Sequence, residues 1–124
     1  MVMSTWTRYD LQSRQIEGGR IEVYRRNDRL GRGACMSLYA NDSEIMRFDL
    51  FDPAHEHWAI GGGDRMYYPK AVDRFALAIW HLRHYGRPCS ALVQKGLVTV
   101  TDMDAQWAKD ALESARTQAK AIKS

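Results

Sequence analysis

The sequence predicts an α+β fold, in which an antiparallel meander of about four strands comes before two main helices that pack on one face of the sheet. In the first half of the chain, apolar and polar residues alternate, which is typical of strands with one buried face. In the second half, apolar residues recur at helical spacing. Strands followed by helices favour an antiparallel sheet with helices on one face.

The strands are expected between Arg20 and Ile60, where alternation is clearest. Their apolar positions are Ile21, Val23, Ala34, Met36, Leu38, Met46, Phe48, Leu50, Trp58 and Ile60. Their opposite positions are Glu22, Tyr24, Arg26, Cys35, Ser37, Tyr39, Ile45, Arg47, Asp49, Phe51, His55 and His57. The short links between them, such as Asn41-Asp42, favour antiparallel hairpins. The segment from Trp6 to Leu11 is a candidate for a further strand.

The first helix is expected near residues 70–85, after an entry at Tyr68-Pro69 and before Gly86 and Pro88. Its apolar stripe consists of Val72, Phe75, Ala76, Ile79 and Leu82. At about 100° per residue, His81 and His84 fall away from this stripe and therefore point away from the sheet. A short helix over Ser90–Lys95 and an edge strand at L-V-T-V, residues 97–100, are expected next.

The final helix is expected near residues 103–122. Thr101 and Asp104 have the spacing of a capping box. The apolar side consists of Ala108, Ala111, Leu112, Ala115, Ala119 and Ile122, and the opposite side of Lys109, Glu113, Arg116 and Lys120. Small alanines allow this helix to approach the sheet closely.

Size and composition fit one folded domain spanning residues 1–124, with 45% hydrophobic and 27% charged residues. The net charge of +3 permits nucleic acid or acidic partners without requiring them. No segment resembles a membrane span or a secretion signal. The two cysteines, Cys35 and Cys89, form no C-x-x-C pair. We therefore expect a cytoplasmic protein with reduced thiols and no cofactor.

The polar side of the predicted sheet is the candidate functional surface. It is rich in aromatic, arginine and histidine residues, which recur at interfaces and ligand sites. The candidate ligand-binding residues are Tyr24, Tyr39, Arg47, Asp49, Phe51, His55 and His57. They would bind a small anionic or aromatic ligand. We expect a second chain or a ligand to bury Tyr24, Tyr39, Phe51 and His57, with a homodimer as the favoured cause, and a plain solvated surface is the alternative.

The stretch from Arg47 to His57 also permits chemistry. If the strand after Asp52-Pro53 folds back antiparallel, His55 and His57 come opposite Phe51 and Asp49, so that His57 and Asp49 could perform acid–base catalysis. The simpler interpretation is that Arg47 and Asp49 pair with cross-strand neighbours. The H-x-H spacing alone is a weak indication of a metal site, and none is predicted.

Two further features carry alternatives. The arginines of the first predicted hairpin could contact RNA phosphates; they are Arg25, Arg26, Arg29 and Arg32. Nucleic acid is a secondary expectation because acidic residues lie nearby. Cys35 is placed on the polar face between Tyr24 and Arg47, where it is either a buried inert thiol or one activated by arginine.

The stretch R-F-D-L-F-D-P-A-H-E-H-W, residues 47–58, resembles the histidine-bearing strand of small bacterial proteins grouped as domains of unknown function. This resemblance covers about the central third of the chain. It implies a bacterial, cytoplasmic α+β protein without an assigned reaction, and it transfers no catalytic residue.

Overall fold

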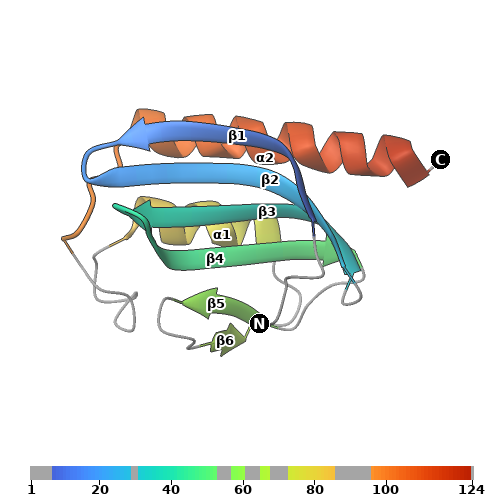
Figure 1. Cartoon of the computed structure of the whole chain (residues 1–124), viewed down its shortest axis with the longest axis horizontal. Coiled ribbons are helices and arrows are strands. Elements are labelled where there is room, and N and C mark those ends of the chain that lie inside the picture. Colours follow the sequence, from blue (N-terminus) through green and yellow to red (C-terminus); the bar gives the residue numbers. More distant parts are fainter. Residues whose placement is uncertain are drawn as a thin grey trace.

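The structure is a computed structural model that describes residues 7–28, 31–52, 57–60, 65–67, 73–85 and 96–123. The described residues form a six-stranded antiparallel sheet in the order β1-β2-β3-β4-β5-β6 and two helices (Figure 1). The elements are β1 (Thr7–Ile16), β2 (Gly19–Asp28), β3 (Gly31–Ala40), β4 (Ser43–Asp52), β5 (His57–Ile60), β6 (Arg65–Tyr67), α1 (Arg74–Arg83) and α2 (Asp102–Lys123). The predicted α+β meander is confirmed. The four predicted strands correspond to β2–β5, whereas β6 was not predicted.

The hydrophobic core lies between one face of the sheet and the helices. Both helices lie behind the sheet in Figure 1, and α2 packs across β1, β2 and β3 while α1 packs on β4 and α2. The buried residues of the core are Ile21, Val23, Ala34, Met36, Leu38, Ala40, Ile45, Met46, Phe48, Leu50, Ala78, Ile79, Leu82, Val98, Ala105, Ala108, Ala111, Leu112 and Ala115. The prediction that Leu38 and Phe48 face the core is confirmed; the side chain of Trp58 lies outside the described part.

Ile45 is an exception to the predicted alternation. It was assigned to the polar face, but it is 7% exposed and belongs to the core. The reason is a register shift, in which Leu38 pairs with Met46 whereas Tyr39 pairs with Glu44. The shift accommodates one extra residue in β4 and turns Glu44 toward Tyr39.

The first helix begins at Arg74, whereas the sequence predicted a helix near residues 70–85. Asp73 caps α1, because its side chain accepts hydrogen bonds from the amides of Phe75 and Ala76 at 2.9 and 3.2 Å. The prediction that His81 points away from the sheet is wrong. His81 is 9% exposed, and its ring centroid lies 5.7 Å from that of Phe48 on β4. Because α1 packs on both β4 and α2, its buried face is wider than a single apolar stripe.

The capping box predicted for the second helix is confirmed. The Thr101 amide donates to the Asp104 carboxylate at 2.9 Å, and the Asp104 amide donates to the Thr101 hydroxyl at 3.1 Å. Asp104 also accepts from Nε of Arg14 on β1 at 2.8 Å. The start of α2 is therefore attached to the sheet.

The turns β1–β2 and β3–β4 meet at one end of the sheet. The Asn41 amide donates to the Gly18 carbonyl at 2.9 Å, and the Thr99 amide donates to Glu17 at 3.0 Å. The edge strand predicted for residues 97–100 is wrong, because its pairing is the isolated bridge between Glu17 and Thr99.

A bulge interrupts β1, the strand that the sequence indicated only from Trp6 to Leu11. Its register with β2 shifts between Tyr9 and Gln12, and Asp10 has a φ of 55°. The Asp10 carboxylate accepts from Nε of Arg25 at 2.9 Å, and the Arg25 guanidinium lies over the ring of Tyr9. This arrangement gives the bulge its own ion pair and bends an edge strand.

Several predictions concern residues outside the described part: the helix entry at Tyr68-Pro69, the helix end at Gly86 and Pro88, the short helix over 90–95, and residues Trp6, Arg29, His55 and Cys89. Within the described residues, neither helix combines the length and apolar character needed to cross a membrane.

Candidate functional site

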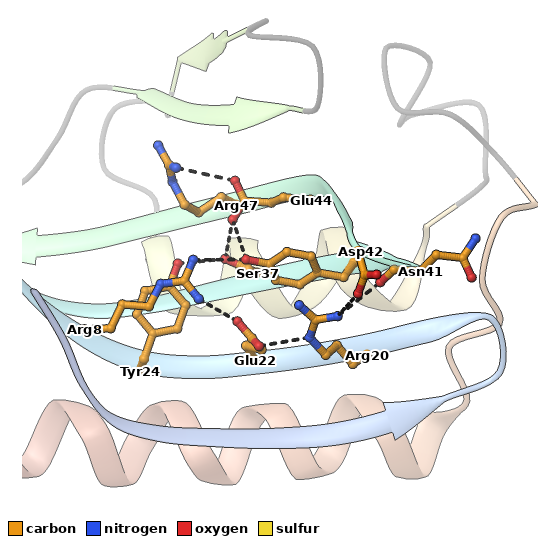
Figure 2. Close-up of polar contacts among 10 residues, drawn as sticks. Arg8, Arg20, Glu22, Tyr24, Ser37, Asn41, Asp42, Glu44 and Arg47 are labelled. Carbon is orange, nitrogen blue, oxygen red and sulfur yellow. Dashed lines mark hydrogen bonds and ion pairs between the residues drawn. The ribbon is translucent and has the colours of Figure 1, made fainter. Parts of the chain in front are cut away.

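The sheet face opposite the helices carries a connected set of polar side chains from β1–β4 (Figure 2). We call it the polar face, and its described members are Arg8, Arg20, Glu22, Tyr24, Arg26, Cys35, Ser37, Tyr39, Glu44, Arg47 and Asp49. Strand register explains the grouping. Tyr24, Cys35 and Asp49 are successive cross-strand partners on β2, β3 and β4. Side chains that pair in this way project from the same face.

Tyr24 lies at the centre of the polar face and is fully buried. Its hydroxyl lies 2.8 Å from that of Ser37, which donates to the Glu44 carboxylate at 2.9 Å. The guanidinium carbon of Arg8 lies 4.5 Å from the centre of the Tyr24 ring. The chain alone therefore covers this tyrosine.

Tyr39 is enclosed in a similar way. It is 7% exposed, and Arg20 lies over its ring at 4.0 Å. Its hydroxyl accepts from Nη2 of Arg8 at 3.0 Å. We expected that burial of Tyr24 and Tyr39 would require another chain or a ligand. That expectation is wrong, because arginines of β1 and β2 bury both rings.

Arg47 and Asp49 form the β4 part of the polar face. Nε of Arg47 lies 3.2 Å from Oδ1 of Asp49, and Nη1 lies 3.4 Å from Oε1 of Glu44. Asp49 also accepts from Nη1 of Arg26 at 3.0 Å. The predicted pairing with cross-strand neighbours is confirmed for Asp49, which pairs with Arg26 of β2, whereas Glu44 and Asp49, which contact Arg47, lie on its own strand.

The charged groups alternate in sign along the network. From Arg20 the contacts run to Glu22, then to Arg8, and through the Tyr39 hydroxyl to Glu44. They continue through Arg47 and Asp49 to Arg26. Four guanidinium groups thus meet three carboxylates, which leaves one positive charge in excess among these described side chains. Asp42 also contacts Arg20, but its side chain is fully exposed and water screens its charge.

Burial suppresses ionisation of the two weak acids on this face. It raises the pKa of Tyr24 far above its ordinary value of 10. Burial also raises the pKa of the Cys35 thiol, and nearby Asp49 adds to the effect. The hypothesis of an arginine-activated thiol is therefore wrong, and Cys35 is a buried free cysteine. It lies between Tyr24 and Asp49, not between Tyr24 and Arg47.

The histidine part of the predicted site is only partly described. Strand β5 is antiparallel to β4, with Met46 opposite Ile60 and Arg47 opposite Ala59. These two pairs make up the register between the strands, and Asp49 and His57 are not partners in it. His55 and the side chains of Phe51 and His57 lie outside the described part. The Arg/Asp half of the predicted cluster is present, and its contact with histidine stays a prediction.

The proposed RNA contact is wrong for two of its arginines. Arg25 and Arg26 are 7% and 5% exposed, and they pair with Asp10 and Asp49. Their guanidinium groups are engaged inside the fold and do not reach phosphates. In the described part of the chain, no group of three or more His, Cys, Asp or Glu side chains is placed to hold a metal ion.

Sequence reasoning missed several members of the polar face. Arg8 was missed because β1 has no apolar alternation that would mark its faces. Glu44 was missed because the register shift at Tyr39 is not visible in the pattern. Glu22 and Ser37 were assigned to the correct face, but their contacts depend on these two residues. Comparison with family models, curated proteins and solved structures finds no match for this chain.

Proposed function

We propose that the protein is a binding protein that takes up a small anionic ligand at the β4 end of the polar face, with Arg47 as the anchoring group. The long contacts of Arg47 support this proposal most directly, because its Nε lies 3.2 Å from Oδ1 of Asp49 and its Nη1 lies 3.4 Å from Oε1 of Glu44. A partly exposed guanidinium with contacts of this length can donate to an anion from outside the network.

Arg47 is accessible enough to receive that anion. Its side chain is 29% exposed, similar to Arg8 at 32% and Arg20 at 25%, whereas Arg26 is 6% exposed. Its contacts at 3.2 and 3.4 Å are longer than those of ordinary charge-assisted hydrogen bonds. Burial opposes its charge, but Asp49 and Glu44 together raise its pKa, so it stays a cation. In Figure 2 its guanidinium extends from β4 toward β5 and β6.

The ligand class follows from the donor geometry of arginine. A guanidinium fork matches a carboxylate or phosphate in bidentate fashion. Phe51, His55 and His57 are proposed to complete the site, because they come from the adjoining segments of β4 and β5. An aromatic carboxylate would satisfy both the charge and these neighbours.

A thermal-shift series tests this proposal with benzoate, acetate and inorganic phosphate, each compared with chloride at equal ionic strength. A ligand at 100 times its Kd stabilises the folded state by about 2.7 kcal/mol. We expect at least one of these anions to raise Tm for the wild type and to have no effect on Arg47→Gln. Arg32→Gln, which removes an exposed arginine outside the network, should respond like the wild type. An equal response of Arg47→Gln would disprove anchoring at Arg47.

A second candidate is an enzyme that uses His57 with Asp49 for acid–base chemistry. The antiparallel pairing of β4 and β5 supports it, because Asp49 and His57 belong to neighbouring strands of the sheet. A contact with the Asp49 carboxylate should raise the pKa of His57. NMR titration of the histidines in the wild type and in Asp49→Asn tests this, and an unchanged His57 titration rejects the pair.

A homodimer, a cytoplasmic location and a bacterial origin remain parts of the proposal. The second subunit could itself supply the anion that Arg47 receives. Light scattering over a range of protein concentrations distinguishes this case, because the wild type should then dimerise and Arg47→Glu should not.

A further inference from the structure

A groove lies between the outer sides of the two helices, on the side of the molecule opposite the polar face (Figure 1). It encloses about 440 Å³, and its apolar lining consists of Phe75, Ala76, Ile79, Trp80 and Leu112. Ligand pockets in proteins commonly have volumes in this range. The sheet and the core separate this groove from the polar face, because both helices lie on the opposite side (Figure 1).

The groove has one open aromatic wall. Trp80 is 42% exposed, so a large part of its ring is accessible beside the groove. Its ring stacks on that of His84 with centroids 4.4 Å apart, and it meets His81 edge to face at 5.0 Å. These two contacts hold the indole in place beside the groove without covering it. An apolar ligand could therefore bury indole surface without reorganising the wall.

The two helices run antiparallel, and this orientation determines which charged residues lie at each end of the groove. The chain leaves α1 and enters α2 at the same end of the molecule (Figure 1). Arg116 lies over the ring of Phe75, so the start of α1 faces the later part of α2. Lys109 precedes Arg116 by roughly 10 Å along α2. Lys109 therefore lies toward the C-terminal end of α1, where Arg83 is located.

The two ends of the groove differ in charge for this reason. At one end, the Asp73 carboxylate caps α1 and Arg116 is stacked on Phe75. At the other end, Arg83 and Lys109 are exposed and line the groove. Glu113 lines the groove between the ends. An apolar floor that leads to a pair of exposed cations complements a molecule with an apolar body and one terminal negative charge.

We propose that this groove binds a medium-chain carboxylate, with the alkyl chain on Ile79, Leu112 and Trp80 and the carboxylate between Arg83 and Lys109. Transfer of the chain from water stabilises the complex, and the two cations orient it. The site is independent of the anion site proposed at Arg47.

Titration with octanoate tests the proposal, with the indole N–H signal of Trp80 as the NMR readout. That signal is assigned by its loss in Trp80→Phe. We expect octanoate to cause a saturable shift of this signal. We expect 1-octanol, which lacks the charge, to bind at least about tenfold more weakly than octanoate. The double variant Arg83→Gln/Lys109→Gln should lose a similar factor for octanoate and none for 1-octanol. Both residues are exposed, so this variant should fold.

Three further variants separate the alternatives. Arg32→Gln removes an exposed arginine elsewhere and should bind octanoate like the wild type, as should Arg47→Gln. Ala76→Trp keeps both cations but fills the groove, and it should abolish the shift. Equal affinity for octanoate and 1-octanol, or an unaffected double variant, would overturn the proposal. A Trp80 signal that shifts with protein concentration alone would assign the groove to a second copy of the chain instead.

Discussion

Arg26 on β2 and Asp49 on β4 form an ion pair across the intervening strand β3, with 3.0 Å between Nη1 and Oδ1. Their side chains are 6% and 14% exposed. The residue of β3 directly opposite Arg26 is Gly33, which places no side chain on the path between them. The two charges therefore lie together in a largely dry environment.

Asp49→Asn is predicted to destabilise the protein by about 3 kcal/mol, because it removes the carboxylate that lies 3.0 Å from the buried Arg26 guanidinium. The substitution keeps the size of the side chain, so packing is preserved. Urea unfolding followed by circular dichroism measures the change. Asp42→Asn is the matched control, since that carboxylate is fully exposed, and it should not change stability measurably. Equal effects of the two substitutions would show that water screens the Arg26–Asp49 pair as well.

Alternation in the sequence predicts the apolar face of the sheet well. Val23, Met36, Leu38 and Phe48 are all almost completely buried, because a strand against a helix layer must place its apolar residues on one side. The pattern fails where geometry departs from strict alternation. Ile45 enters the core because of one extra residue in β4.

The candidate site was predictable in its β4 part and not in its β1 part. Arg47 and Asp49 are alternate residues of one strand, so their proximity follows from sequence alone. Arg8 covers Tyr24 from a strand whose sequence, T-R-Y-D-L-Q-S-R-Q-I, has no continuous apolar face. Such a contact depends on tertiary pairing, which local patterns do not contain.

Asp104→Asn is predicted to lower stability at neutral pH by about 1 kcal/mol, since it weakens the cap of α2 and the contact with Arg14. Burial opposes the charge of Asp104, but hydrogen bonds from Thr101 and Arg14 lower its pKa below 3.8. Its stabilisation is therefore present above about pH 4 and is lost as the pH falls through the folded-state pKa. Urea unfolding at several pH values should show the wild type and the variant converging in acid. A constant difference at all pH values would mean that the charge contributes nothing.

His81 is predicted to make the protein less stable in mild acid. Burial, with a smaller contribution from His84, lowers its pKa below 6.5, so the folded state holds it neutral. The unfolded chain then binds the proton first, and stability falls as the pH decreases below 6.5 until the folded-state pKa is reached. His81→Gln cannot titrate and should lose less stability than the wild type between about pH 7.5 and pH 5.5. Identical losses would exclude His81 as the source and assign them to the other histidines.

Gly19→Ala is predicted to destabilise the protein by about 3 kcal/mol, more than a simple change of backbone preference would. A Cβ at Gly19 would clash with the carbonyl oxygen of Tyr39 and lie 2.8 Å from its carbonyl carbon. Both atoms are backbone, so relief requires β2 and β3 to move apart at this end, which also displaces the Tyr39 side chain under Arg20. Gly96→Ala is the control. It has a φ of +74° but open space around its Cβ, and should cost only about 1 kcal/mol. Urea unfolding should rank the two substitutions in this order, and the reverse order would show that β2 and β3 separate easily here.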